Sequence, residues 1–132
     1  MARGISETAF SSQVEDLLKM FGWHWCHFRP ALTGAGWRTA MTGKKGITDY
    51  IAARPPRLIF AELKDEVKGN TPEQEEWQNI LRQCQRVILN QPMTVQGKMA
   101  TLILDKPVDM LMTPEVYLWR PSQIEEIARI LR

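Results

Sequence analysis

The chain has 132 residues, which suits one compact domain, and 44% of them are hydrophobic, which excludes a disordered chain. The formal net charge is only +2, so overall charge does not indicate a nucleic-acid-binding protein, although local clusters of charge still can. No apolar run approaches the ~20 residues of a membrane span, and no signal-peptide pattern is present. The two cysteines, Cys26 and Cys84, give no disulfide framework, so a cytoplasmic location is expected.

The first third of the chain predicts a helix, a strand and a loop. Hydrophobic residues recur at three- and four-residue steps over 7–21, as in an amphipathic helix that Ser6 begins and Gly22 ends. The aromatic segment 23–29 predicts a strand. Residues 30–46 hold four glycines, three cations and no acid. They predict a loop, and long loops of this kind are usually functional or disordered.

The remaining elements predict an α/β domain with a mixed β-sheet flanked by helices. Strands at about 49–53 and 57–64 are apolar on both faces, as in the middle of a sheet. Residues 71–84 predict a helix with a Thr71–Gln74 capping box. The segment 86–115 is an insertion within a single domain, with strands expected in its "RVILN" and "MATLIL". A strand at 116–120 precedes a last helix, for which Ser122 and Glu125 predict a capping box.

A pair of carboxylates is predicted where the strands of the 49–64 hairpin begin and end. A turn centred on Pro55–Pro56, with a loop longer than these two residues, places Asp49 opposite Glu62 with Cβ atoms ~5 Å apart. Like charges so placed destabilise a sheet, and a divalent cation would relieve that cost. Lys64 shares the face of Glu62, where it can act on a water or a phosphate. An ordinary surface Glu–Lys pair, with Asp49 merely starting a strand, is the alternative.

The segment "GITD", which ends at Asp49, and the segment "ELK", which begins at Glu62, resemble the signature of PD-(D/E)XK nucleases, with Thr48 where that family usually has proline. The wider context resembles the VRR-NUC branch, which includes phage and bacterial nucleases and Holliday-junction-resolvase-like proteins. The similarity covers most of the chain except 86–115, and its other matching segments are "GWHWCHFRPA", "TPEQEEW" and "YLWRPSQIEEI".

This resemblance implies a restriction-endonuclease-like core and Mg²⁺- or Mn²⁺-dependent hydrolysis of DNA, with branched or structured DNA favoured. It implies catalytic roles for four residues and metal binding for three. The catalytic residues are Asp49, Glu62, Lys64 and Gln74, and the metal ligands are Glu7, Asp49 and Glu62. Glu15 and Gln13 are alternatives to Glu7, although Glu15 is expected to face solvent.

DNA contact is expected from Arg29 and from the 30–46 segment. Phosphates would meet Arg29, Arg38, Lys44 and Lys45, and Trp37 would pack against a base or sugar. The alternative is a solvated loop with Trp37 in the core. A zinc site is disfavoured because His27 points away from Cys26 on a strand.

The function expected from the sequence is a metal-dependent DNA endonuclease of DNA repair or recombination, in a bacterial or phage-infected cell. The alternative is a non-catalytic nucleic-acid-binding or interaction module on the same scaffold. A homodimer is also expected, because two sites related by a twofold axis suit cleavage of a duplex.

Overall fold

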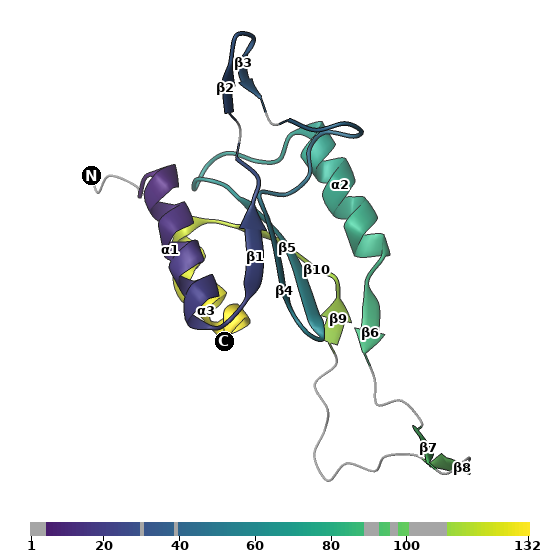
Figure 1. Cartoon of the computed structure of the whole chain (residues 1–132). Coiled ribbons are helices and arrows are strands. Elements are labelled where there is room, and N and C mark those ends of the chain that lie inside the picture. The colour runs from purple at the N-terminus through teal and green to yellow at the C-terminus, as the bar shows by residue number, and fades with distance from the viewer. Residues whose placement is uncertain (1–4, 30, 39, 89–92, 96–97, 101–110) are drawn as a thin grey trace.

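A computed structural model describes residues 5–29, 31–38, 40–88, 93–95, 98–100 and 111–132 (Figure 1). Its centre is a four-stranded sheet in the order β1-β4-β5-β10. The strands are β1 (His24–His27), β4 (Tyr50–Arg54), β5 (Arg57–Leu63) and β10 (Glu115–Trp119). β4 pairs antiparallel with β1 and β5, whereas β10 runs parallel to β5. The predicted mixed α/β class is confirmed, with the two apolar strands in the middle of the sheet.

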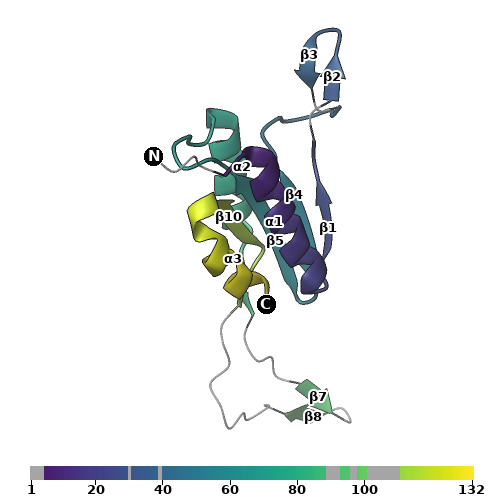
Figure 2. The same ribbon diagram turned by 90° about the vertical axis from the view of Figure 1, so that its left-hand side faces the viewer.

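Helices cover both faces of this sheet. They are α1 (Glu7–Met20), α2 (Pro72–Gln83) and α3 (Ile124–Leu131), the last preceded by the 3-10 turn η1 (Pro121–Gln123). α1 and α3 lie together on one face and α2 lies on the other (Figures 1 and 2). No helix among the described residues is long and apolar enough to cross a bilayer.

The main core lies between the sheet and the α1–α3 layer. It consists of side chains from these two helices and from one face of the strands, chiefly Phe10, Val14, Leu18, Tyr50, Ala52, Ile59, Ala61, Ile127 and Leu131. Burying each of the larger apolar side chains stabilises the fold by roughly 1.5–3 kcal/mol. α1 follows its prediction closely: the Ser6 hydroxyl accepts the Ala9 N–H at 3.1 Å and caps the helix.

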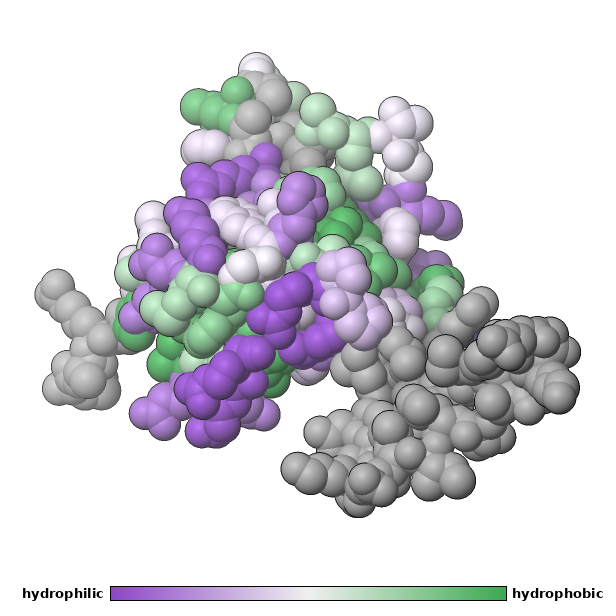
Figure 3. All heavy atoms as spheres, turned by 60° about the horizontal axis from the view of Figure 1, so that its bottom comes forward, coloured by the Kyte–Doolittle hydropathy of each residue, from purple (hydrophilic) through white to green (hydrophobic). Residues whose placement is uncertain are grey.

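Two arginines beside the β4–β5 turn fix that turn against both helices. Arg54 donates to the carbonyl of Phe21 at 2.8 Å, after the end of α1, and Arg57 donates to the carbonyl of Ile130 at 2.7 Å, near the end of α3. Cations are favourable at helix C-termini. This end of the molecule presents a broad hydrophilic surface (Figure 3). From this turn the β4–β5 ladder runs to the pair Tyr50–Ala61 at the open end of the hairpin.

The predicted hairpin register is confirmed, but the expected loop length is wrong. Tyr50 pairs with Ala61 and the ladder continues to Arg54 and Arg57, so the loop is Pro55–Pro56 alone. The Pro55–Pro56 peptide bond is cis, which is the bond geometry of a type VI turn and needs no positive φ.

Three shorter pairs of strands complete the described chain. They are β2 (Ala31–Thr33) with β3 (Gly36–Arg38), β6 (Arg86–Ile88) with β9 (Leu111–Thr113), and β7 (Met93–Val95) with β8 (Lys98–Ala100). The 30–46 segment is therefore not all loop, because three-residue strands are too short to show a period. The expected strand in "RVILN" is confirmed over 86–88, whereas residues 101–104 of "MATLIL" lie outside the described residues, as do 89–92, 96–97 and 105–110 of the 86–115 insertion.

The expected Ser122–Glu125 capping box is wrong. The amide and hydroxyl of Ser122 both donate to the carboxylate of Glu66, which follows β5, at 2.6 and 2.9 Å. Gln123 instead accepts the backbone N–H of Arg120 at 2.8 Å. A long-range partner thus replaces the local one.

Candidate active site

Asp49 and Glu62 mark the open end of the β4–β5 hairpin. Asp49 directly precedes β4, and the ladder that pairs Tyr50 with Ala61 places Asp49 opposite Glu62. The Asp49 carboxylate accepts the backbone N–H of Leu63 through Oδ2 at 2.8 Å, so it is turned toward β5. Glu62 is only 2% exposed. The predicted opposition of two carboxylates is therefore present.

The surroundings of this pair make negative charge costly. Burial raises the pKa of Glu62 to about 7, the charge of Asp49 adds to the rise, and the Lys64 ammonium opposes it. Burial also raises the pKa of Asp49, against the hydrogen bond from Leu63. Glu62 therefore titrates near neutral pH, as carboxyl groups at functional sites often do.

Gln74, at the start of α2, links Glu62 to Lys64. Its Nε2 donates to Glu62 Oε1 at 2.8 Å, and its Oε1 accepts from Lys64 Nζ at 2.8 Å. The same oxygen accepts the Thr71 N–H at 2.9 Å, which closes the predicted capping box. Lys64 Nζ lies 3.4 Å from Glu62 Oε1, on the predicted side. The helix cap thus orients both side chains, so four of the predicted residues meet at this end of the hairpin.

One oxygen of this cluster fits a cation. Glu62 Oε2 is buried and has no hydrogen-bond partner among the described residues, although unpaired buried acceptors are rare. Mg²⁺ and Mn²⁺ prefer oxygen ligands, and Mg²⁺ is commonly held by one or two carboxylates, waters and a substrate phosphate. Asp49 and Glu62 supply that donor set.

The predicted third metal ligand is Glu7. Within the described ranges no three His, Cys, Asp or Glu side chains form a group that could hold a metal ion, so the structure does not gather Glu7 with Asp49 and Glu62, and Glu7 as a ligand stays a prediction. Glu7 is the first residue of α1 and is exposed. Its negative charge makes a small contribution to raising the pKa of Asp49. Gln13 is also exposed and lines a hollow beside α3.

Glu15 has a structural role that its sequence position hid. Its carboxylate accepts the Tyr50 hydroxyl at 2.7 Å and lies 3.5 Å from Arg29. The expectation that Glu15 faces solvent is wrong, since its side chain is 13% exposed and the hydroxyl of the buried Tyr50 needs an acceptor there. His27 stacks on Tyr50 at 4.1 Å between ring centroids and accepts from Arg29 Nε at 3.2 Å. Burial lowers the pKa of His27, which agrees with a neutral ring that accepts.

Gly46 allows the segment before Asp49 to pack closely on α2, a role that was not predicted from the sequence. It has φ +100°, and a Cβ there would lie 2.6 Å from the backbone carbonyl carbon of Glu73, in the first turn of α2. Only glycine allows that approach. The segment leading to Asp49 therefore packs directly on the helix turn that carries Gln74. Thr48, where the nuclease family usually has proline, is fully buried and donates to the Tyr50 carbonyl at 3.2 Å.

Of the expected DNA-contacting residues, Arg29 and Lys45 already lie within ion-pair distance of acidic side chains. Trp37 is 69% exposed, so its alternative placement in the core is wrong. Lys45 is exposed and lies 3.6 Å from Glu73, while Arg29 contacts His27 and Glu15. Lys44 is exposed, and its carbonyl accepts the Trp77 indole N–H at 3.1 Å. Arg38 ends β3.

Comparison of the chain with models of protein families, with curated proteins and with solved structures gives no match.

Proposed function

We propose that this chain is a metal-dependent nuclease of the PD-(D/E)XK type, with a restriction-endonuclease-like core, that hydrolyses phosphodiester bonds in DNA. The observation that supports this most is the buried Asp49–Glu62 pair with its unpartnered Glu62 Oε2, beside Lys64. A protein that only needed a stable sheet end would gain from an apolar or single-charged pair at this position.

In this proposal Asp49 and Glu62 hold the cation, which lowers the pKa of a bound water and neutralises charge on the scissile phosphate. Lys64 is the residue that acts on the phosphate or the water. Two of its three N–H donors are directed at Gln74 Oε1 and Glu62 Oε1, which leaves one for a phosphate oxygen or a water. Gln74 is a positioning residue, because it holds both Glu62 and Lys64.

Branched or otherwise structured DNA is the proposed substrate, and a homodimer with two such sites is the proposed assembly. The exposed cations Lys44 and Lys45 would bind phosphates on either side of the cleaved bond. Light scattering at tens of micromolar, roughly the range for a moderate interface, tests the dimer.

The deciding experiment is cleavage of junction, flap and linear duplex DNA with Mg²⁺, Mn²⁺ or EDTA. The protein should cut at least one of these DNAs with either metal and none with EDTA. A Glu62→Gln preparation made in parallel controls for contaminating nuclease. Cleavage that survives EDTA, or that Glu62→Gln retains in full, would contradict the proposal.

A second candidate is a non-catalytic nucleic-acid-binding module. It is favoured by the Lys64–Glu62 ion pair, which partly fills the site, and by the lack of a three-ligand group among the described residues. Calorimetric titration separates the two functions. Salt-sensitive DNA binding without Mg²⁺ or Mn²⁺ binding would support the module.

A further inference from the structure

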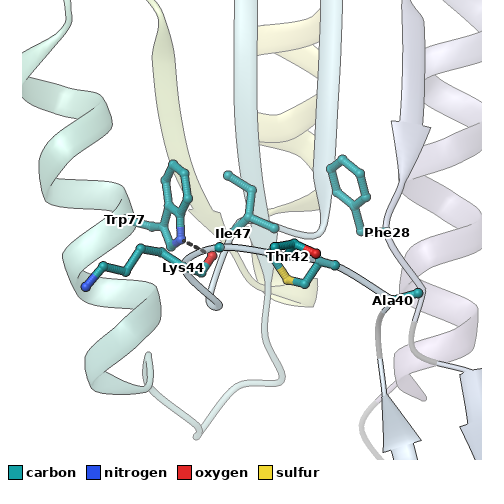
Figure 4. A pocket seen from close by; sticks show the side chains of 8 residues that line it. Phe28, Ala40, Thr42, Lys44, Ile47 and Trp77 are labelled. Atoms are coloured by element: carbon teal, nitrogen blue, oxygen red, sulfur yellow. Dashed lines mark hydrogen bonds between the residues drawn. The ribbon is translucent and has the colours of Figure 1, made fainter.

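A hollow of about 510 Å³ lies among residues that precede Asp49 in the chain and residues of α2 (Figure 4). Its walls come from the end of β1, the 40–47 segment and α2. Figure 4 shows Phe28 and Trp77 on opposite sides, Ile47 between them, and the segment with Thr42 and Lys44 closing one side. The lining is mainly apolar, with polar groups only along that segment. We call this hollow the Phe28–Trp77 pocket.

The pocket is built from residues that also hold the candidate active site. The Phe28 N–H donates to the Asp49 carbonyl at 2.8 Å. Ile47 precedes Asp49 by two residues, which spans at most about 7 Å of chain. Trp77 follows Gln74 by three residues on α2, a rise of about 4.5 Å. If a phosphate of a DNA strand lay beside Asp49, the pocket would therefore be about one nucleotide away along that strand.

The chemistry of the walls differs from what a phosphate needs. Phe28 remains 36% exposed and Met41, also in the lining, 44% exposed, although each would be more stable when covered. The segment from 29 to 48 has four cations and no acid. An apolar peptide would not use these cations, and a bare phosphate would not use the aromatic walls. A nucleotide uses both, because its base has an apolar face and its backbone is charged.

We propose that the Phe28–Trp77 pocket binds one unpaired nucleobase of the strand whose phosphate meets Asp49, Glu62 and Lys64. This rests on the proposed function and deepens it by naming the substrate class: DNA with an unpaired nucleotide next to the cleaved bond. A base within an intact duplex is stacked and paired, so it would have to be extruded before it could enter. Phe28 and Trp77 offer their rings to the base, and Thr42 and Lys44 lie beside its polar edge and backbone.

The test compares two single strands of equal charge, a dT12 oligonucleotide and a 12-mer of abasic nucleotides. Binding is measured by fluorescence anisotropy at one salt concentration in EDTA. The wild type should bind dT12 about 5- to 150-fold more tightly than the abasic strand, the range that one stacked base contributes. Phe28→Ala should remove most of that ratio. Trp77→Phe should retain most of it, because the ring stays while the hydrogen bond to Lys44 is lost.

Met20→Ala is the matched control, since Met20 is 71% exposed and lies at the end of α1, away from the pocket. It should leave the ratio unchanged. Equal affinity for the two strands, no binding of either strand, or an undiminished ratio in a folded Phe28→Ala would overturn the pocket proposal. Because no metal or cleavage is involved, failure of the nuclease proposal would leave this result standing, and the reverse also holds.

Discussion

Across the open end of the β4–β5 hairpin, the Asp49 carboxylate helps burial to raise the pKa of Glu62 from 4.5 to about 7. The folded protein therefore binds this proton more tightly than the unfolded chain does. At pH values well below 4.5 the raised pKa does not change the free energy of unfolding, because the carboxyl group is protonated in both the folded and the unfolded protein. Between pH 4.5 and 7 the unfolded chain ionises this group while the folded protein keeps its proton, so the free energy of unfolding falls over this range and levels off above pH 7.

Glu62→Gln should remove this pH dependence, because the amide keeps the shape of the side chain and cannot ionise. Relative to the variant, the wild type should lose up to about 3 kcal/mol of unfolding free energy between pH 5 and pH 8. Urea unfolding across this range checks the difference, with Glu126→Gln, on the exposed face of α3, as the control. If Glu62→Gln is several kcal/mol less stable than the wild type at pH 8, the prediction is wrong, and the Lys64–Glu62 ion pair stabilises the folded protein by more than the burial of the charge costs.

Mn²⁺ should stabilise the wild type and neither Glu62→Gln nor Asp49→Asn. A ligand that binds only the folded state at 100 times its Kd adds about 2.7 kcal/mol, which shifts the melting temperature by several degrees. The affinity should rise with pH through 7, because the cation competes with the Glu62 proton. Thermal melting with and without Mn²⁺ measures both effects. A shift that persists in both variants would place the metal elsewhere.

Lys64→Met should separate chemistry from metal binding. Losing a preorganised charge beside the reacting group typically lowers a rate by about 10²–10³-fold. The Mn²⁺ shift in melting temperature should remain, since Asp49 and Glu62 are unchanged. Single-turnover cleavage gives the rate, and Lys68→Met, an exposed lysine in the following loop, is the control. Equal losses in both lysine variants would indicate a general effect of charge on DNA binding.

Gln74→Ala and Thr71→Ala separate the helix cap from the site. Each removes part of the same capping box, at a cost of about 0.5–2 kcal/mol of stability. Only Gln74→Ala also releases Glu62 and Lys64. Urea unfolding should therefore show similar stability losses, while cleavage assays should show a large loss of rate for Gln74→Ala alone. Matching rates would mean that Gln74 serves the helix and not the site.

Local patterns predicted most of this site. The β4–β5 register follows from two apolar strands about one turn, which places Asp49 opposite Glu62, and the Gln74 cap follows from its spacing to Thr71. The misses depend on distant partners. Glu15 is held by the Tyr50 hydroxyl, and no spacing within α1 signals a contact with β4.

The local environment of a glycine is also not readable from the sequence. Gly43 and Gly46 have φ values of +103° and +100°, so alanine is strained at both, at a cost of about 1–3 kcal/mol. At Gly43 a Cβ would meet nothing within 4 Å, whereas at Gly46 it would lie 2.6 Å from the backbone of Glu73. The two glycines look alike in the sequence and differ only through α2.

Gly46→Ala should therefore destabilise the protein more than Gly43→Ala, by about a further 1–3 kcal/mol for the forced shift of backbone. Because that shift separates Asp49 from the helix turn of Gln74, Gly46→Ala should also weaken the Mn²⁺-induced rise in melting temperature. Gly43→Ala isolates the cost of backbone strain in the same segment. Urea unfolding and melting with Mn²⁺ measure the two effects. Equal stability losses in the two variants would show that the approach to α2 is loose, and a full Mn²⁺ shift in Gly46→Ala would show that the carboxylates do not depend on it.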